Sequence, residues 1–331
     1  MKLELLKALY QKYHLSEIDY KIAVALLEDA DSFWEHCSLD DITVTELDEL
    51  ISYWVKSKKN TVPNFIVLMR YVKLIKRHDL FIHLTKYTGG LDVIENILES
   101  MKLEAGDEAA DAFKKELSIP ILGTPPWEMP KFTSQFMTYL EKRFDGNRLR
   151  TILAGNNHGI PAQAFAKEKE YYAKASSLEV YLKELHQRKV AELQDYCNRN
   201  EVWFEQKITQ EVVDFVASDQ EMLSAVLKND KLYLKKIPYD IIGYLHAKNK
   251  DEKAYYSCHC PFAREAIKDK KTTISPNWCY CSAGFEKYPF EILFGKKLPI
   301  KVLHSVLKGD SNCRFEISLA EIDDEKIKER R

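Results

Sequence analysis

The sequence predicts a predominantly helical α+β protein, in which an N-terminal helical bundle is followed by a C-terminal α+β domain with an antiparallel sheet. Three observations lead to this fold class. Apolar residues recur at helical spacing through residues 1–117, and strand-like alternation begins only after about residue 200. Two closely spaced cysteine pairs then follow within residues 258–281.

The first predicted domain, residues 1–117, takes its helices from apolar stripes and cap signals. Ser16 is a candidate N-cap, and Thr43 followed by Glu46 fits a capping box. Further apolar stripes cover residues 65–75 and 91–98. These segments amount to about five helices, which is typical of a helical bundle.

Residues 118–200 are expected to be a connection and a helical segment that packs on the C-terminal domain. The stretch SIPILGTPPWEMP, residues 118–130, carries four prolines and a glycine, so no helix crosses it. Helices are expected over residues 132–144, 148–153 and 162–196, with the polar segment AGNNHGIP as a break.

The third predicted domain, residues 201–331, is an α+β domain that contains the cysteine cluster. KLYLKK, residues 231–236, alternates as a half-buried strand does and follows a Lys-Asn-Asp hairpin turn. Residues 238–245 and 278–294 are expected to be helical, whereas residues 253–257, 298–307 and 313–319 are expected to be strands.

Composition excludes several classes of partner. Lys and Arg total 49 against 51 Asp and Glu, so no basic field favours nucleic acid. The N-terminus MKLELLKALYQKYH lacks the pattern of a secretory signal, and no apolar stretch is long enough for a bilayer. We therefore expect a cytoplasmic protein without membrane partners, whose seven cysteines are thiols or ligands rather than disulfides. The oligomeric state is left open.

The cysteine pattern predicts a metal site. Cys258-His259-Cys260 and Cys279-Tyr280-Cys281 are separated by 18 residues. Two thiolate pairs from two segments suit Zn²⁺, which takes four ligands in a closed structural site. Zinc is therefore the expected cofactor. An iron–sulfur cluster also uses four thiolates, and redox chemistry or simple packing of buried thiols are further alternatives.

The one-residue spacing within each pair limits the backbone. Side chains two positions apart share a face of a strand but diverge by about 200° on a helix. We therefore expect extended or turn-like backbone at both pairs. Pro261 after the first pair and Ser275-Pro276-Asn277 before the second favour two ligand loops, each leading into a helix.

A resemblance appears in residues 275–319. A cysteine with Gly-Phe opening a helix, a strand, and a closing Gly-Asp-x-x-Cys-x-Phe strand look like the vinyl-reductase-type domain, to which the bacterial aminothiazoline-carboxylate hydrolase family is related. The matching positions are Cys281, Gly284, Phe285, Gly295, Gly309, Asp310, Cys313 and Phe315. The resemblance implies an α+β domain that binds small, often hydrophobic molecules and has cysteines as suspected zinc ligands.

This chain departs from that family in two respects. The family often has a further cysteine shortly before the Gly-Asp turn, where this chain has Ser305. Cys258, Cys260 and Cys279 lie outside the shared pattern. The resemblance thus adds Cys313 as a possible fifth participant in a reorganised ligand set.

Other candidates have both a functional and an ordinary interpretation. Arg264 would bind an anionic ligand or pair with Glu265. His259 and His304 would be ligands or general bases, or surface and packing histidines. Asn157 and His158 would line a small-molecule pocket or form the stop of a helix.

Three classes of function remain open. The first is a binding module with a structural zinc site and a small-molecule-binding C-terminal domain. The second is an enzyme, either a small-molecule hydrolase or a thiol redox protein that uses the same cysteines. The third is a structural or interaction protein without a ligand. No catalytic residue is assigned, and no phosphate-binding or dinucleotide-binding loop is present in the sequence.

Overall fold

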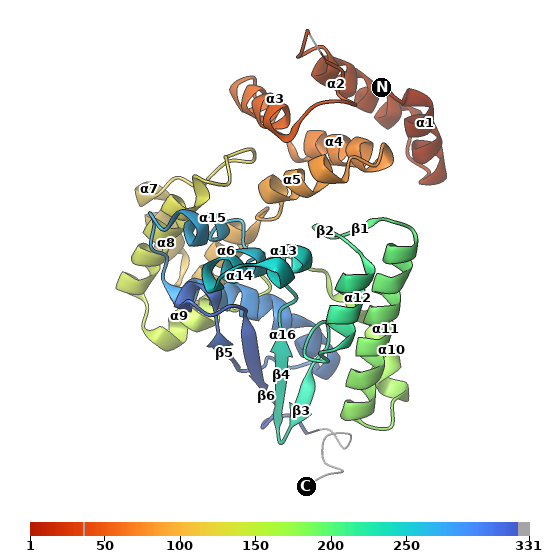
Figure 1. Ribbon diagram of the computed structural model, residues 1–331. Coiled ribbons are helices and arrows are strands. Elements are labelled where there is room, and N and C mark those ends of the chain that lie inside the picture. The colour runs from red at the N-terminus through yellow and green to blue at the C-terminus, as the bar shows by residue number, and fades with distance from the viewer. Residues whose placement is uncertain (36, 324–331) are drawn as a thin grey trace. The chain divides into compact units, whose positions relative to one another are not determined.

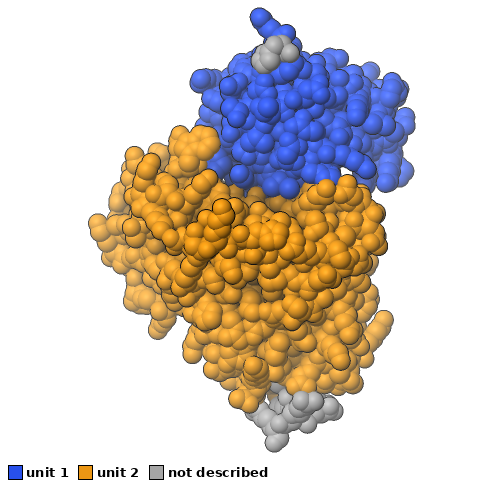
Figure 2. Space-filling model, viewed as in Figure 1, with its two compact units in different colours: residues 1–89, 120–126 blue, residues 90–119, 127–331 orange. Residues whose placement is uncertain are grey.

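A computed structural model describes residues 1–35 and 37–323 and confirms a helical α+β fold with a small antiparallel sheet in the C-terminal region. The chain forms two compact units (Figure 2). Unit 1 comprises residues 1–89 and 120–126, and unit 2 comprises residues 90–119 and 127–331. No helix of the described segments has the length and apolar character needed to cross a membrane.

Unit 1 is a bundle of five described helices (Figure 1): α1 Leu3–Lys12, α2 Glu17–Asp31, α3 Val44–Lys56, α4 Val62–Leu74 and α5 His78–Thr88. The expected caps are confirmed. Ser16 forms a capping box with Asp19, and Thr43 forms one with Glu46. The apolar faces enclose a core whose largest fully buried side chains include Trp54, Phe65 and Tyr71.

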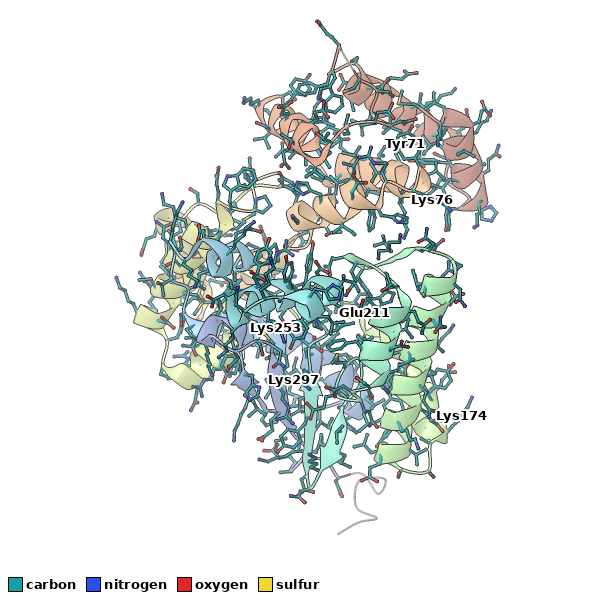
Figure 3. The ribbon with its side chains drawn as sticks, viewed as in Figure 1. Tyr71, Lys76, Lys174, Glu211, Lys253 and Lys297 are labelled. Carbon is teal, nitrogen blue, oxygen red and sulfur yellow. The ribbon has the colours of Figure 1, made fainter. Side chains whose placement is uncertain are left out.

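Unit 1 also contains buried polar links between helices. Tyr71, labelled in Figure 3, donates its hydroxyl hydrogen bond to Asp40 and accepts one from the backbone N–H of Lys2. The carboxylate of Asp48 on α3 accepts a hydrogen bond from the Tyr87 hydroxyl at 2.6 Å and lies 2.5 Å from Nε2 of His83. Tyr87 and His83 both belong to α5. Burial opposes ionisation of Asp48, but these two partners outweigh it and lower the pKa of the carboxyl group.

We expect Asp48→Ala to lower the free energy of unfolding by about 1.5–3 kcal/mol near neutral pH, because two hydrogen bonds to a charged group are lost. A lowered folded-state pKa stabilises the protein above the unfolded value of about 4, and this contribution is lost as pH falls through the folded value. Urea unfolding at several pH values should therefore show the gap to wild type narrowing below about pH 4. Exposed Glu49 gives the control, Glu49→Ala, with an expected change within about 0.5 kcal/mol. An undiminished gap in acid would contradict this account.

Unit 2 combines helices with a small antiparallel sheet (Figure 1). Its helical elements are α6 Val93–Ala105, α7 Asp107–Glu116, α8 Met129–Arg143, α9 Gly146–Leu153, η1 Ala162–Phe165, α10 Ala166–Lys174, α11 Leu178–Asn198, α12 Gln210–Ala217, α13 Ile241–His246, α14 Lys250–Ser257, α15 Arg264–Asp269, η2 Pro276–Cys279, α16 Tyr280–Phe294 and η3 Val306–Lys308.

The sheet of unit 2 has the order β3-β4-β6-β5 and is antiparallel throughout. Its strands are β3 Val226–Lys228, β4 Lys231–Lys235, β5 Ile300–His304 and β6 Arg314–Ser318, and a separate hairpin pairs β1 Val202–Trp203 with β2 Gln206–Lys207. Leu232 opposes Ile317 and Leu234 opposes Phe315, so these four side chains cover the buried face. The alternation expected for residues 231–236 therefore reflects a half-buried strand.

Two features differ from the sequence-based expectations. Residues 90–117, expected in the first domain, form α6 and α7 within unit 2, because their apolar faces join its core. Residues 253–257, expected to be a strand, lie in α14. The side chain of Asn249 accepts a hydrogen bond from the backbone N–H of Glu252 and so starts this helix.

A close helix-to-loop approach fixes α16, which also packs against β5. A Cβ atom added to Gly284 would come closest to the carbonyl oxygen of Gly155 and would lie 2.6 Å from the carbonyl carbon and 2.9 Å from the carbonyl oxygen of Ala154. Only glycine permits this approach, because real Cβ atoms do not come so near to backbone.

We expect Gly284→Ala to destabilise unit 2 by at least about 1–3 kcal/mol, since backbone rather than a flexible side chain must move. Thermal or urea unfolding of the full chain measures the effect. Gly146→Ala is the matched control, because a Cβ atom there meets open space at a residue of ordinary backbone angle. Equal stabilities of the two variants would contradict the tight packing at Gly284.

Candidate functional site

Four segments of unit 2 bring five cysteines into its main hydrophobic core. Cys258 directly follows α14, and Cys260 lies in the loop before α15. Cys279 ends η2, Cys281 lies in the first turn of α16, and Cys313 directly precedes β6. All five are free thiols, and Cys260 alone among them is half-buried rather than buried.

The two cysteine pairs differ in backbone. Cys258 has extended geometry, with φ −79° and ψ 112°, in a loop that leads into α15 as expected. The expected second loop is instead helical, because Ser275 caps η2 at its N-terminus and η2 continues directly into α16. Cys279 and Cys281 therefore diverge, as side chains two positions apart on a helix must.

Burial raises the pKa of all five thiols, and repulsion from neighbouring thiols adds to the effect at Cys258, Cys279, Cys281 and Cys313. These charge interactions include every pair that Cys258, Cys260, Cys279 and Cys313 can form. Cys281, whose pKa rises to about 12, interacts with Cys260 and takes a hydrogen bond from Asn157. Cys313 thus interacts with three of the other thiols, whereas the interaction given for Cys281 is with Cys260.

Two polar donors point at sulfur atoms. The indole N–H of Trp278 donates to Sγ of Cys260 at 3.1 Å, and the Ser305 hydroxyl donates to Sγ of Cys279 at 2.9 Å. Ser305 is fully buried, and the Asp310 carboxylate accepts from its backbone N–H at 2.9 Å. The position at which the resembling family often has a cysteine is therefore in direct contact with a thiol of this chain.

Thiols are the type of ligand that zinc prefers, but the spacing of these side chains is not that of a metal site. Soft sulfur ligands from separate segments, with N–H and O–H donors directed at the sulfurs, are the surroundings that thiolates bound to a metal receive. In residues 1–35 and 37–323, no group of three or more His, Cys, Asp or Glu side chains is spaced to hold a metal ion. Neutral thiols do not attract one another to the distances found in a metal site, whereas thiolates are held at those distances by the cation that they bind.

Lys236, which the sequence did not indicate as a site residue, places a positive charge near the thiols. Its ammonium pairs with Glu286 at 3.2 Å and lies 4.5 Å from the centre of the Phe285 ring. Burial opposes its charge, but Glu286, Cys313 and Glu205 together raise its pKa. The only signal in the sequence was that the strand pattern KLYLKK ends on this lysine.

Arg264 is the second cation of the region. It is 3% exposed and stacks on the Tyr239 ring, with its guanidinium carbon 3.8 Å from the ring centre. Glu265, the expected ion-pair partner, lies 3.8 Å from Nε. Cys258 is among the groups with which the Arg264 charge interacts.

The remaining candidates have different surroundings. Both ring nitrogens of His259 are engaged, Nδ1 with Glu205 at 3.1 Å and Nε2 with the Ile237 carbonyl at 2.7 Å, so neither is free for a metal. The side chain of Asn157 donates to the Leu153 carbonyl at the end of α9, as a helix stop would.

The last two histidine candidates differ from each other. The His158 ring lies edge-on to Phe285 with centres 5.1 Å apart. The residue is exposed, and the positive charge of Lys236 contributes to lowering its pKa. His304 is exposed at the end of β5.

These features define a helical α+β protein whose C-terminal part buries thiols beside two cations. Residues 207–323, which contain all five of these cysteines, match the model of a family of unknown function, DUF6144. No curated protein and no solved structure matches the chain.

Thiol labelling should follow burial and pKa. With a chelator present at about pH 8, we expect a disulfide reagent to modify half-buried Cys197 well before the five thiols of unit 2's core, because a thiolate is the attacking species. Mass spectrometry of the labelled peptides identifies the order. Cys197→Ser should remove the rapidly labelled Cys197 peptide, and all remaining thiols should react in urea. Rapid labelling of any core thiol would instead favour redox chemistry.

Proposed function

We propose that unit 2 is a binding domain that holds one Zn²⁺ through Cys258, Cys260, Cys279 and Cys313, in a structural site. The observation that supports this proposal is that three chain segments bring these thiols into one core, where Trp278 and Ser305 donate hydrogen bonds to the sulfurs of Cys260 and Cys279. Buried thiols are costly to ionise without a cation, and a divalent cation reverses that cost.

Four thiolates leave no open position for water, which is the pattern of structural rather than catalytic zinc. The ion would connect the end of α14, the loop before α15, η2 and the start of β6. Since such a site forms only in the folded chain, its binding free energy becomes folding free energy. Binding requires the sulfurs to approach one another as they lose their protons.

The nearby groups support a structural rather than nucleophilic role for these thiols. Raised pKa values disfavour the thiolate that a hydrolase or redox nucleophile needs. His259 has both nitrogens engaged and so offers no base to either neighbouring cysteine. Small-molecule binding, which the family resemblance implies, stays a prediction.

Elemental analysis tests the proposal. Protein purified without added metal should contain about one zinc per chain, as expected for a single four-thiolate site. Cys313→Ser should lose this zinc and melt at a lower temperature, whereas Cys281→Ser should retain it. The two cysteines are a matched pair, since they are 7% and 5% exposed.

Three outcomes would contradict the proposal. Zinc-free wild-type protein that also takes up none on dialysis against Zn²⁺ would exclude the site. Zinc lost from Cys281→Ser but kept by Cys313→Ser would exclude this ligand set. Visible absorption with bound iron would replace zinc by an iron–sulfur cluster.

A further inference from the structure

Arg264 combines deep burial with unused hydrogen-bond donors. The residue is 3% exposed, and among the described residues neither its Nε nor its Nη1 has a hydrogen-bond partner. Arginine does not lose its charge in a protein, so these unused donors belong to a buried cation. Buried polar groups, and charged ones above all, normally have acceptors in contact with them, so the free donors of Arg264 indicate a place for an oxygen ligand.

The stacking of Arg264 determines which part of its guanidinium group is free. The guanidinium carbon lies 3.8 Å from the centre of the Tyr239 ring, so the ring covers one flat face of the group. The N–H bonds lie in the guanidinium plane and point outward past the ring. Tyr239 is itself supported by the His259 ring, which meets it edge-on with centres 5.5 Å apart. The stack therefore holds the face of the cation and leaves its edges to an acceptor.

Tyr239 supplies a further donor beside the cation. Its hydroxyl oxygen is buried and, like Nε and Nη1 of Arg264, has no hydrogen-bond partner among the described residues. The two residues come from separate elements, since Tyr239 lies between β4 and α13 whereas Arg264 begins α15. They are 9% and 3% exposed, so the stack is close to the surface of unit 2 rather than sealed in its centre. A guanidinium and a phenol in contact can both donate to one oxyanion.

Glu265 does not occupy these donors, and its charge limits which anion fits. Its Oε1 lies 3.8 Å from Nε of Arg264, beyond hydrogen-bond distance, and accepts from the Tyr255 hydroxyl at 3.2 Å. A carboxylate this close repels a second anion, and it repels a phosphate group of charge near 2− more than a carboxylate of charge 1−. The position therefore favours a carboxylate ligand over a phosphate.

We propose that Arg264 and Tyr239 form a subsite for the carboxylate group of a small organic molecule, which lies at the edge of the guanidinium plane. The stacked ring fixes the donors before the ligand arrives, so little side-chain ordering is needed on binding. Of the two interpretations that the sequence left open for Arg264, this is the anionic ligand rather than the ion pair with Glu265. The subsite is independent of the zinc site, because none of its donors is a thiol.

Titration of the full chain with acetate tests the subsite, at constant ionic strength and with chloride as the reference salt. Spectra of arginine-labelled protein should show a saturable shift of the Arg264 Nε–H resonance, and the melting temperature should rise with acetate. Arg264→Met should abolish both responses. Tyr239→Phe keeps the stacked ring and removes the hydroxyl, so the dissociation constant for acetate should rise about 10-fold, as for one hydrogen bond to a charged group. Inorganic phosphate should bind more weakly than acetate.

Two further variants serve as controls. Arg188 likewise stacks on a tyrosine, with its guanidinium carbon 4.1 Å from the Tyr171 ring centre, and has an unpartnered Nε, but its Nη2 pairs with Glu168 at 2.6 Å. Arg188→Met should therefore keep the acetate affinity of wild type. Glu265→Gln removes the repelling charge at nearly constant size and should bind acetate at least as tightly as wild type.

Each outcome decides the proposal. Saturable acetate binding that Arg264→Met loses and Arg188→Met keeps supports the subsite. A wild-type response to acetate no larger than that to chloride would overturn it, and so would equal binding by Arg264→Met. If Arg264→Met does not fold, Tyr239→Phe decides, because unchanged acetate affinity in that variant would overturn the subsite. Weaker binding by Glu265→Gln would overturn it in favour of a structural Arg264–Glu265 pair, and tighter binding of phosphate than of acetate would overturn the choice of a carboxylate.

Discussion

Unit 2 depends on the contact between the backbone of α16 at Gly284 and the loop after α9. This approach leaves no room for a side chain, so it fixes both the axis and the rotation of the helix. The N-terminal end of α16 then sets Cys281, and the helix continues from η2 with Cys279. At its other end, Glu291 accepts the backbone N–H of Leu298 at 3.0 Å, and Lys287 donates to the Leu298 carbonyl at 3.2 Å. Helix α16 therefore fixes where the cysteines at its N-terminal end lie with respect to the sheet.

Charge is the second theme of unit 2. Burial in its core disfavours the thiolate form of the cysteines and the charged form of the cations. A thiolate and a cation close together would each stabilise the charge of the other. Lys236 from the end of β4 and Arg264 from α15 approach the thiols from different elements. A polar arrangement of this kind is sensitive to the loss of one member, since the remaining charge is left uncompensated.

Local signals in the sequence predicted local structure well. The capping boxes at Ser16 and Thr43, the strand at residues 231–235 and the helix that ends at Phe294 follow from cap chemistry and periodicity. The helix predicted over residues 278–294 includes Cys279, so the extended backbone predicted at the second cysteine pair is wrong, and Pro276 lies in the first turn of η2, where proline is well suited. Lys236 and the contact of Ser305 with Cys279 depend on segments distant in sequence, which no local pattern reveals.

The division of the chain has a consequence for its synthesis. The chain leaves unit 1 at residue 89, forms α6 and α7 in unit 2, and returns to unit 1 for residues 120–126. The side chain of Asn60 donates to the Leu122 carbonyl at 2.7 Å, so this returning segment is bonded into the bundle. During translation, the five helices of unit 1 are therefore synthesised before residues 120–126, which complete the unit. Unit 1 reaches its final set of contacts only after two helices belonging to the other unit have been translated.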